Sequence, residues 1–388
     1  MSWPMVRLGD VCKITMGQAP SGSFYNENAH GYALIAGAGD FGQTNPEPKK
    51  YTTKASKLSK PGDIILCIRA TIGDLNWSNK EYCLGRGVAG LRGKDSLDQG
   101  FLWHCLNYNK NTLSSKGTGS TFKQISRNHI EELIIPLPPI KEQRRIADVL
   151  DKAENIRKKR KQAIKLADDF LRATFLEMFG DPVMNPKGFE IKVLSDFFID
   201  EKNGTKCGPF GSALKKDEYT SEGVPVWNMD NITLKGDFID LPSLWVSENK
   251  YQALESYSVL DGDVIISRAG TVGKMGVVRS ITEKSIISTN LIRVRFGEKL
   301  YPEYFVSLMT YCKGRVGNLK TGPDGTFTHM NTGVLSNLEF PYPPLELQKK
   351  YIKIRQSVML IIDKYHHFGF RIDETFCAIN QTAFLCQP

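Results

Sequence analysis

The sequence repeats itself with a period of about 200 residues, and this repeat limits the folds that the chain can adopt. The matching segments are residues 61–66 (PGDIIL) with 261–266 (DGDVII), 69–73 (RATIG) with 268–273 (RAGTVG), 121–122 with 326–327, and 133–139 with 338–344. The later matches share one offset of 205 without gaps. Because a chain of 388 residues is too long for one ordinary core, the repeat predicts two similar globular domains.

Beyond the proline pair of each copy, apolar residues recur in the 3-4 spacing of a coiled-coil helix. The predicted seam positions of the first helix are Ile146, Val149, Ala153, Ile156, Ala163 and Phe170. The same register, 205 residues later, gives Tyr351, Ile354, Val358, Ile361, Phe368 and Ile372. Arg160 also falls on the first seam, where a charged residue fixes register at a cost in stability.

A helix with one apolar stripe must bury it, and a partner with the same stripe is present in this chain. We therefore expect the two helices to pair, antiparallel if a pseudo-two-fold axis relates the halves. The alternative is that each helix folds back on its own globular part. The predicted α+β fold has two similar mixed α/β domains separated by an antiparallel coiled coil of two long helices. Its expected segments are residues 1–138 (first globular domain), 139–181 (first long helix), 182–343 (second globular domain) and 344–388 (second long helix).

Charge and composition favour a polyanionic partner in a cytoplasmic setting. Fifty-one Lys and Arg residues against 42 Asp and Glu residues give a net charge of +9. The sequence contains no apolar run of about 18 residues that could cross a membrane. None of its eight cysteines forms a Cys-x-x-Cys motif, so reduced thiols are expected.

Motifs for catalysis were sought and not found. Residues 270–274 (GTVGK) are too short for a phosphate-binding Walker loop, and no His-Glu-x-x-His motif occurs. We therefore expect a non-catalytic protein that binds no metal or cofactor of its own. An enzyme acting on nucleic acid is the alternative, and it would need clustered acids or metal ligands.

Polar, basic, glycine-containing loops occur at equivalent places in both copies, and they offer the groups that bind phosphates and base edges. The candidate DNA-binding residues are Arg69, Thr71, Lys116, Ser120, Thr121, Lys123, Arg268, Thr271, Lys274, Lys320, Thr326 and His329. Arg69 and Arg268 lead into paired loops and could reach guanine, although an arginine at a strand end is as often in a salt bridge. Ordinary surface turns remain the alternative for these loops.

The order of these features resembles the specificity subunits of type I restriction-modification systems. A globular domain is followed by residues 133–139 (LIIPLPP), then by a long helix that ends at residues 175–182 (FLEMFGDP), and the pattern repeats over essentially the whole chain. Residues 138–146 (PPIKEQRRI) are the most specific part. The resemblance implies two target-recognition domains, each of which reads one half of a split site in double-stranded DNA.

The resemblance also implies two methyltransferase subunits docked on the helices, joined by restriction and translocase subunits. Those partners would carry S-adenosylmethionine, ATP, Mg²⁺ and the active sites. The docking candidates are Glu142, Gln143, Arg144 and Gln348. Since Leu347 replaces Glu142 in the second helix and Gly369 weakens its interior, equal docking of both copies is in doubt.

Rigid helices would hold two readers at a set distance, and major grooves on one face of DNA recur about every 34 Å. The predicted target is therefore bipartite, with a fixed spacer. It is also non-palindromic, because the two copies differ in most loop residues. The alternative is another DNA-binding scaffold, such as the recognition half of a fused restriction enzyme without separate methyltransferase partners.

Overall fold

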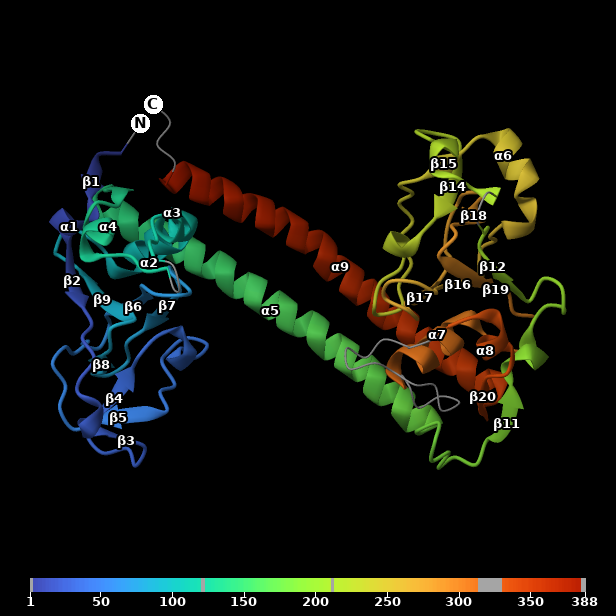
Figure 1. Ribbon diagram of the computed structural model, residues 1–388, viewed down its shortest axis with the longest axis horizontal. Coiled ribbons are helices and arrows are strands. Elements are labelled where there is room, and N and C mark those ends of the chain that lie inside the picture. The colour runs from blue at the N-terminus through green and yellow to red at the C-terminus, as the bar shows by residue number, and fades with distance from the viewer. Residues whose placement is uncertain (1–2, 120–122, 211–212, 313–329, 385–388) are drawn as a thin grey trace. The chain divides into compact units, whose positions relative to one another are not determined.

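The computed structural model describes residues 3–119, 123–210, 213–312 and 330–384. Contacts divide the chain into a first unit, Met1–Gln162 with Tyr365–Pro388, and a second unit, Ala163–Lys364. Two long helices, α5 (Ile140–Phe179) and α9 (Leu345–Phe384), are visible in Figure 1. The unit boundaries cut both helices near their midpoints, so each helix contributes one half to each unit.

The first unit contains two four-stranded sheets and a two-stranded ribbon. One sheet has the antiparallel order β2-β9-β6-β7, the other has the order β3-β5-β4-β8 with β4 and β8 parallel, and β1 pairs with β10. The elements are β1 (Met5–Arg7), α1 (Leu8–Val11), β2 (Cys12–Met16), β3 (Tyr25–Asn26), β4 (Tyr32–Ile35), β5 (Lys50–Thr52), β6 (Ile64–Cys67), β7 (Leu75–Trp77), β8 (Cys83–Leu84), β9 (Val88–Gly93), α2 (Gln99–Tyr108), α3 (Lys110–Ser115), α4 (Arg127–Glu131) and β10 (Ile134–Pro136).

The second unit has the same topology. Its sheets are β12-β19-β16-β17 and β13-β15-β14-β18, with β14 and β18 parallel, and β11 pairs with β20. The elements are β11 (Glu190–Val193), β12 (Thr205–Cys207), β13 (Tyr219–Thr220), β14 (Val224–Trp227), β15 (Trp245–Val246), α6 (Glu248–Ala253), β16 (Val264–Ser267), β17 (Met275–Val277), β18 (Ile286–Ile287), β19 (Leu291–Val294), α7 (Pro302–Tyr311), α8 (Thr332–Ser336) and β20 (Glu339–Tyr342). The internal repeat and the α+β fold class are therefore confirmed.

Strand β6 shows why its sequence is apolar at every position. Ile64 and Leu66 enter the main core beneath α2, whereas Ile65 enters a second core with β4 and β8. All three side chains are fully buried, because the strand is covered on both faces. Strand β16 is buried in the same way, and the ends of these strands position the loops described below.

Both long helices contribute to each main core. In the first unit, Ile146 and Leu150 of α5 pack with Phe384 of α9. In the second unit, the ring of Phe175 on α5 lies 5.3 Å from that of Tyr351 on α9. The beginning of one helix meets the end of the other in both units, so the pairing is antiparallel. The alternative in which each helix contacts only its own globular part is wrong.

The predicted seam is correct in part. Ile146 and Tyr351 are buried, and the half-buried positions are Val149, Ala153, Ala163, Ile354, Val358 and Ile372. The prediction is wrong for Ile156, Phe170, Ile361 and Phe368, which are 50%, 53%, 51% and 61% exposed.

For Phe170 and Ile361 the error has the same cause. Apolar residues stand in adjacent pairs, such as Phe170 with Leu171 and Ile361 with Ile362, and one step turns the helix by about 100°. The second member of each pair is buried, at 2% exposed for Leu171 and 5% for Ile362. The spacing pattern allows either choice, and only packing against the cores decides between them.

Arg160 lies on the seam as predicted, and Gly369 makes room for it. A methyl group added at Gly369 would overlap the Arg160 guanidinium. Arg160 Nη2 lies 3.5 Å from Asp373 Oδ2, and Arg157 Nε lies 2.7 Å from the other oxygen. The glycine that weakens the isolated helix therefore leaves space for this half-buried guanidinium.

Gln143 and Gln348 hold each long helix to its own globular domain. Gln143 Oε1 accepts a bond of 2.8 Å from the Asp98 amide, and its Nε2 donates to the carbonyl oxygens of Ser96 and Pro138. Gln348 Oε1 accepts from the Tyr301 amide at 3.1 Å. Both side chains are fully buried, so their prediction as docking residues is wrong.

Replacing Gln143 by alanine should lower the free energy of unfolding by about 1–3 kcal/mol, because the buried Asp98 amide loses its acceptor. Urea unfolding of the purified chain measures this change. Gln162→Ala, at an exposed position of the same helix, should stay within about 0.5 kcal/mol of wild type. Equal effects of the two substitutions would contradict the structural role of Gln143.

Gly369→Ala should destabilise the wild-type chain but stabilise an Arg160→Ala chain. In the second background the methyl group meets no guanidinium, so the helix propensity of alanine contributes about 1 kcal/mol. A double-mutant cycle of unfolding free energies measures the coupling. A coupling of zero would show that the arginine moves aside freely.

Candidate nucleic-acid interface

In the first unit, several loops converge at one end of the sheet that contains β6 and β9. The Ile68 amide donates to the Gly87 carbonyl at 2.9 Å, and the Gly17 amide donates to the Val88 carbonyl at 2.9 Å. Gly85 joins them through a bond of 2.8 Å to the carbonyl of Ile35. Backbone hydrogen bonds thus hold together segments that are far apart in sequence, as Gly17 and Val88 are.

The predicted loop around residue 120 joins the same cluster. The Ala70 amide donates to the Lys123 carbonyl at 3.0 Å, and the Ile125 amide donates to the Ile68 carbonyl at 3.0 Å. This pairing brings together Arg69, Thr71, Lys116 and Lys123. Thr71 and Lys123 are exposed, whereas Arg69 and Lys116 are half-buried. Ser120 and Thr121 lie outside the described residues.

The turn after β6 is repeated after β16 at an offset of 200. Ala70 has a φ of 62° and Gly270 one of 65°, while Gly73 and Gly273 have φ values of 96° and 83°. Left-handed backbone at the same two places identifies the same turn.

This alignment corrects the predicted equivalence of Arg69 and Arg268. An offset of 200 pairs Arg69 with Ala269 and Arg268 with Ile68, which is 1% exposed. The dipeptide Arg-Ala occurs in both copies, but one residue out of register. The two turns therefore present different side chains from the same backbone.

In the second unit, Arg268 lies over an aromatic ring. Its guanidinium carbon is 4.6 Å from the centre of the Phe210 ring, and its amide donates to the Asn290 carbonyl at 3.0 Å. Phe210 is 56% exposed. A cation–π contact of this kind holds both side chains in place at the loop end of the sheet.

Lys274 and Thr271 of this turn each take part in a hydrogen bond. Lys274 Nζ donates to the Met229 carbonyl at 2.9 Å, and the Thr271 carbonyl accepts from the Ser267 hydroxyl. The Lys274 ammonium thus uses one of its donors on a neighbouring loop, and its role in DNA binding stays a prediction. Lys320, Thr326 and His329 lie outside the described residues.

Sequence reasoning missed Arg86 and Phe210. Arg86 is exposed in the turn between β8 and β9, and this turn belongs to the loop cluster of the first unit. The signal for Arg86 was an arginine between two glycines, flanked by buried strands. Phe210 had no comparable signal, since its exposure depends on the fold.

The start of α5 carries the remaining docking candidates. Glu142 pairs with Arg145 at 2.5 Å, and this hydrogen bond lowers the pKa of Glu142. Arg144 lies 3.6 Å from Asp98. Beside them, a groove of about 380 Å³ is lined by Trp3, Ile146, Val149 and Ile379, among others.

The described part of the chain lacks the clustered ligands of a metal site. No three His, Cys, Asp or Glu side chains come together there as metal ligands would. Burial raises the pKa of Cys12 to about 12, which keeps that thiol protonated. None of the described helices is both long and apolar enough to cross a bilayer.

A family profile for the type I restriction modification DNA specificity domain matches residues 2–166 and again residues 186–363. These two matches cover most of the chain, and each takes in one of the repeats. The chain belongs to the type I DNA specificity family. Members of this family are non-catalytic DNA-recognition components that act in complexes with methyltransferase and restriction subunits.

Known members are similar to different extents. The type I restriction enzyme MjaVIII specificity subunit of Methanocaldococcus jannaschii is 25% identical over 377 residues, which are 93% of this chain and 87% of that one. The putative MjaX specificity subunit of the same organism is 37% identical over 171 residues, 42% of this chain and 40% of that one. A type I S subunit from M. genitalium has the same fold, with a TM-score of 0.64, 17% identity, and coverage of 100% of this chain and 97% of that one.

For a specificity subunit, Lys123→Ala should weaken DNA binding without changing the preferred sequence. Loss of one phosphate contact should reduce the slope of log K against log salt by about 0.9. Titration of the purified methyltransferase complex with duplex DNA at several salt concentrations measures this slope. Lys13→Ala, exposed on β2, is the matched control and should leave the slope unchanged. An unchanged slope for Lys123→Ala would remove that loop from the interface.

Proposed function

We propose that this specificity subunit recognises a bipartite, non-palindromic DNA site, with one half read by the loop cluster of each unit. The observation that carries the proposal is one topology built twice with different loop side chains. The turn after the buried central strand presents Arg69 in one unit and Ala269 in the other.

The two units share one backbone topology but differ in loop side chains, and this combination favours two different half-sites. Backbone frames and phosphate contacts position a protein on DNA, whereas side chains at base edges select the sequence. The two units differ further near these turns. The first unit has Arg86, and the second has Phe210 in contact with Arg268. Two copies of one half-site would require matching side chains, and the turns after β6 and β16 differ at Arg69 and Ala269.

The proposal assigns the paired helices the role of a spacer. Each helix is anchored in the core of both units, through Leu150 and Phe175 for α5 and through Tyr351 and Phe384 for α9. Anchored, hydrogen-bonded helices resist stretching, so they would keep the number of unread base pairs between the half-sites constant.

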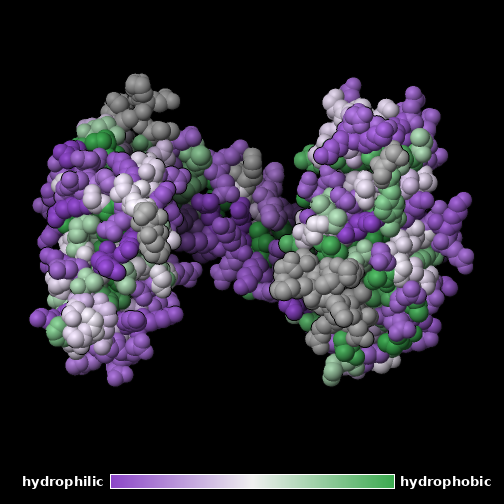
Figure 2. All heavy atoms as spheres, in the orientation of Figure 1, coloured by the Kyte–Doolittle hydropathy of each residue, from purple (hydrophilic) through white to green (hydrophobic). Residues whose placement is uncertain are grey.

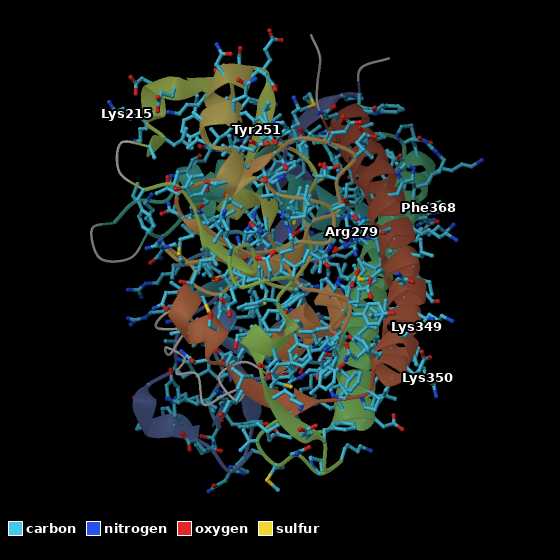
Figure 3. All side chains as sticks on the ribbon, turned by 90° about the vertical axis from the view of Figure 1, so that its right-hand side faces the viewer. Lys215, Tyr251, Arg279, Lys349, Lys350 and Phe368 are labelled. Carbon is cyan, nitrogen blue, oxygen red and sulfur yellow. The ribbon has the colours of Figure 1, made fainter. Side chains whose placement is uncertain are left out.

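Exposed apolar side chains on the helices suit the docking of methyltransferase subunits. In the second unit, Leu166, Phe170 and Leu360 are 60%, 53% and 63% exposed, and in the first unit Phe368 is 61% exposed. Figure 3 labels Phe368 on α9, together with Lys349 and Lys350, and Figure 2 shows green apolar side chains among purple polar ones along the helices. Exposed apolar side chains that lie outside the seam between the two helices are typical of a surface that another helix covers.

We infer two methyltransferase copies from the repeat, with S-adenosylmethionine, ATP and Mg²⁺ bound by partner subunits. The two docking places are not identical. Glu142 and Arg145 form an ion pair at the start of α5, whereas the matching positions of α9 are Leu347 and Lys350. Different affinities for the two copies are expected.

Modified-base sequencing of host DNA, with and without this gene, tests the role and the site together. Loss of the gene should abolish methylation at one two-part motif, and a plasmid copy should restore it. The complex should also contain a methyltransferase subunit when the chain is purified from the host. Unchanged methylation without the gene would overturn the proposal.

Inserting four residues after Ala163 tests the spacer role, because it lengthens α5 by about 6 Å. The methylated motif should keep both half-sites and change the number of base pairs between them. A second variant, with four residues inserted in α9, tests the same relation between helix length and spacer length. An active insertion variant with the original spacer would contradict a rigid spacer.

A further inference from the structure

The turn at residues 85–87 belongs to the loop cluster of the first unit and is held by backbone hydrogen bonds. It joins β8 to β9, and the neighbouring residues Leu84 and Val88 are fully buried. The Gly85 amide bonds the Ile35 carbonyl at 2.8 Å, and the Gly87 carbonyl accepts from the Ile68 amide at 2.9 Å. Three separate segments of the domain thus fix this turn.

Packing requires the glycines on both sides of Arg86. A methyl group at Gly85 would stand 2.9 Å from the Ile35 carbonyl oxygen, and one at Gly87 would overlap the Ala36 carbonyl oxygen. A residue with a side chain is therefore accommodated at the middle position, and Arg86 is exposed there. The backbone places one guanidinium at the surface of a rigid turn.

Arg86 has no hydrogen bond or ion pair with any residue in the described ranges. Other arginines of the same unit are paired, Arg92 with Asp63 at 2.5 Å and Arg127 with Glu131 at 2.7 Å. The carboxylate of Asp40, in the segment that follows Ile35, accepts a hydrogen bond from the Ala36 amide at 2.7 Å. An unpaired guanidinium is available to bind a ligand, and the rigid turn that carries it adds little backbone entropy cost to that binding.

The second unit has the same turn with a different residue. The Leu291 amide bonds the Ser288 carbonyl at 3.2 Å, as the Val88 amide bonds the Gly85 carbonyl at 3.2 Å. The alignment places Thr289 at the position of Arg86. The two units therefore differ in hydrogen-bonding chemistry at one matched point of the interface.

We propose that Arg86 reads a guanine in the half-site bound by the first unit, through paired hydrogen bonds to O6 and N7 in the major groove. This proposal rests on the proposed function and names one residue that determines its specificity. Threonine at position 289 cannot form the same pair of bonds, so the second half-site would not require guanine at the matching place.

The test uses the purified complex with its methyltransferase subunits and duplexes that carry every single base-pair change in the methylated motif. Arg86→Ala should reduce the preference for one G·C pair by roughly 10- to 100-fold and leave the other positions unchanged. Arg86→Lys keeps the charge but replaces the planar pair of donors by one ammonium group, so it should retain the salt dependence and recover only part of the preference. Arg7→Ala, at an exposed arginine on β1, is the matched control and should change nothing.

Thr289→Ala should alter only the other half-site. A uniform loss of affinity in Arg86→Ala that Arg86→Lys restores would overturn the proposal, because it would indicate a phosphate contact. If both Arg86 variants bound all of these duplexes with the wild-type preference, the proposal would be overturned as well. A wild-type complex without a two-part preference would instead refute the proposed function, before any variant is compared.

Discussion

The antiparallel contact of α5 with α9 is the interaction on which the rest of the structure depends. Neither main core is complete without both helices. Phe175 and Tyr351 meet in one core, and Leu150 and Phe384 meet in the other. Because each helix begins in one core and ends in the other, the burial of apolar side chains stabilises the domains and the helix pair together. A change that separates the helices would therefore expose both cores.

Polar contacts add specificity to this apolar pairing. Gln143 and Gln348 bind carbonyl and amide groups of the loops that precede α2 and α7, so each helix leaves its domain in a defined direction. Arg160 occupies the space over Gly369 and lies near Asp373. Such buried polar groups contribute little net stability, but they disfavour other arrangements of the same apolar faces. A DNA reader benefits from this restriction, since misplaced loops would miss their base pairs.

In the proposed function, recognition resides in loops held by this frame. The turns after β6 and β16 have the same backbone, with left-handed residues at matching places, yet they carry different side chains. Arg86 and Thr289 differ in the same manner at a second turn. A shared frame with variable loops allows two different half-sites to be read without a change in fold.

The sequence alone determined the repeat, the two long helices, their antiparallel pairing and the family, because these follow from periodicity and from motifs that recur at a fixed offset. Tertiary structure decided which member of each adjacent apolar pair is buried, as at Phe170 and Leu171, since a one-residue shift preserves the spacing. It also separated Arg268 from Arg69 and brought Arg86 to the interface. Those placements depend on hydrogen bonds between distant segments, and such bonds leave no local pattern in the sequence.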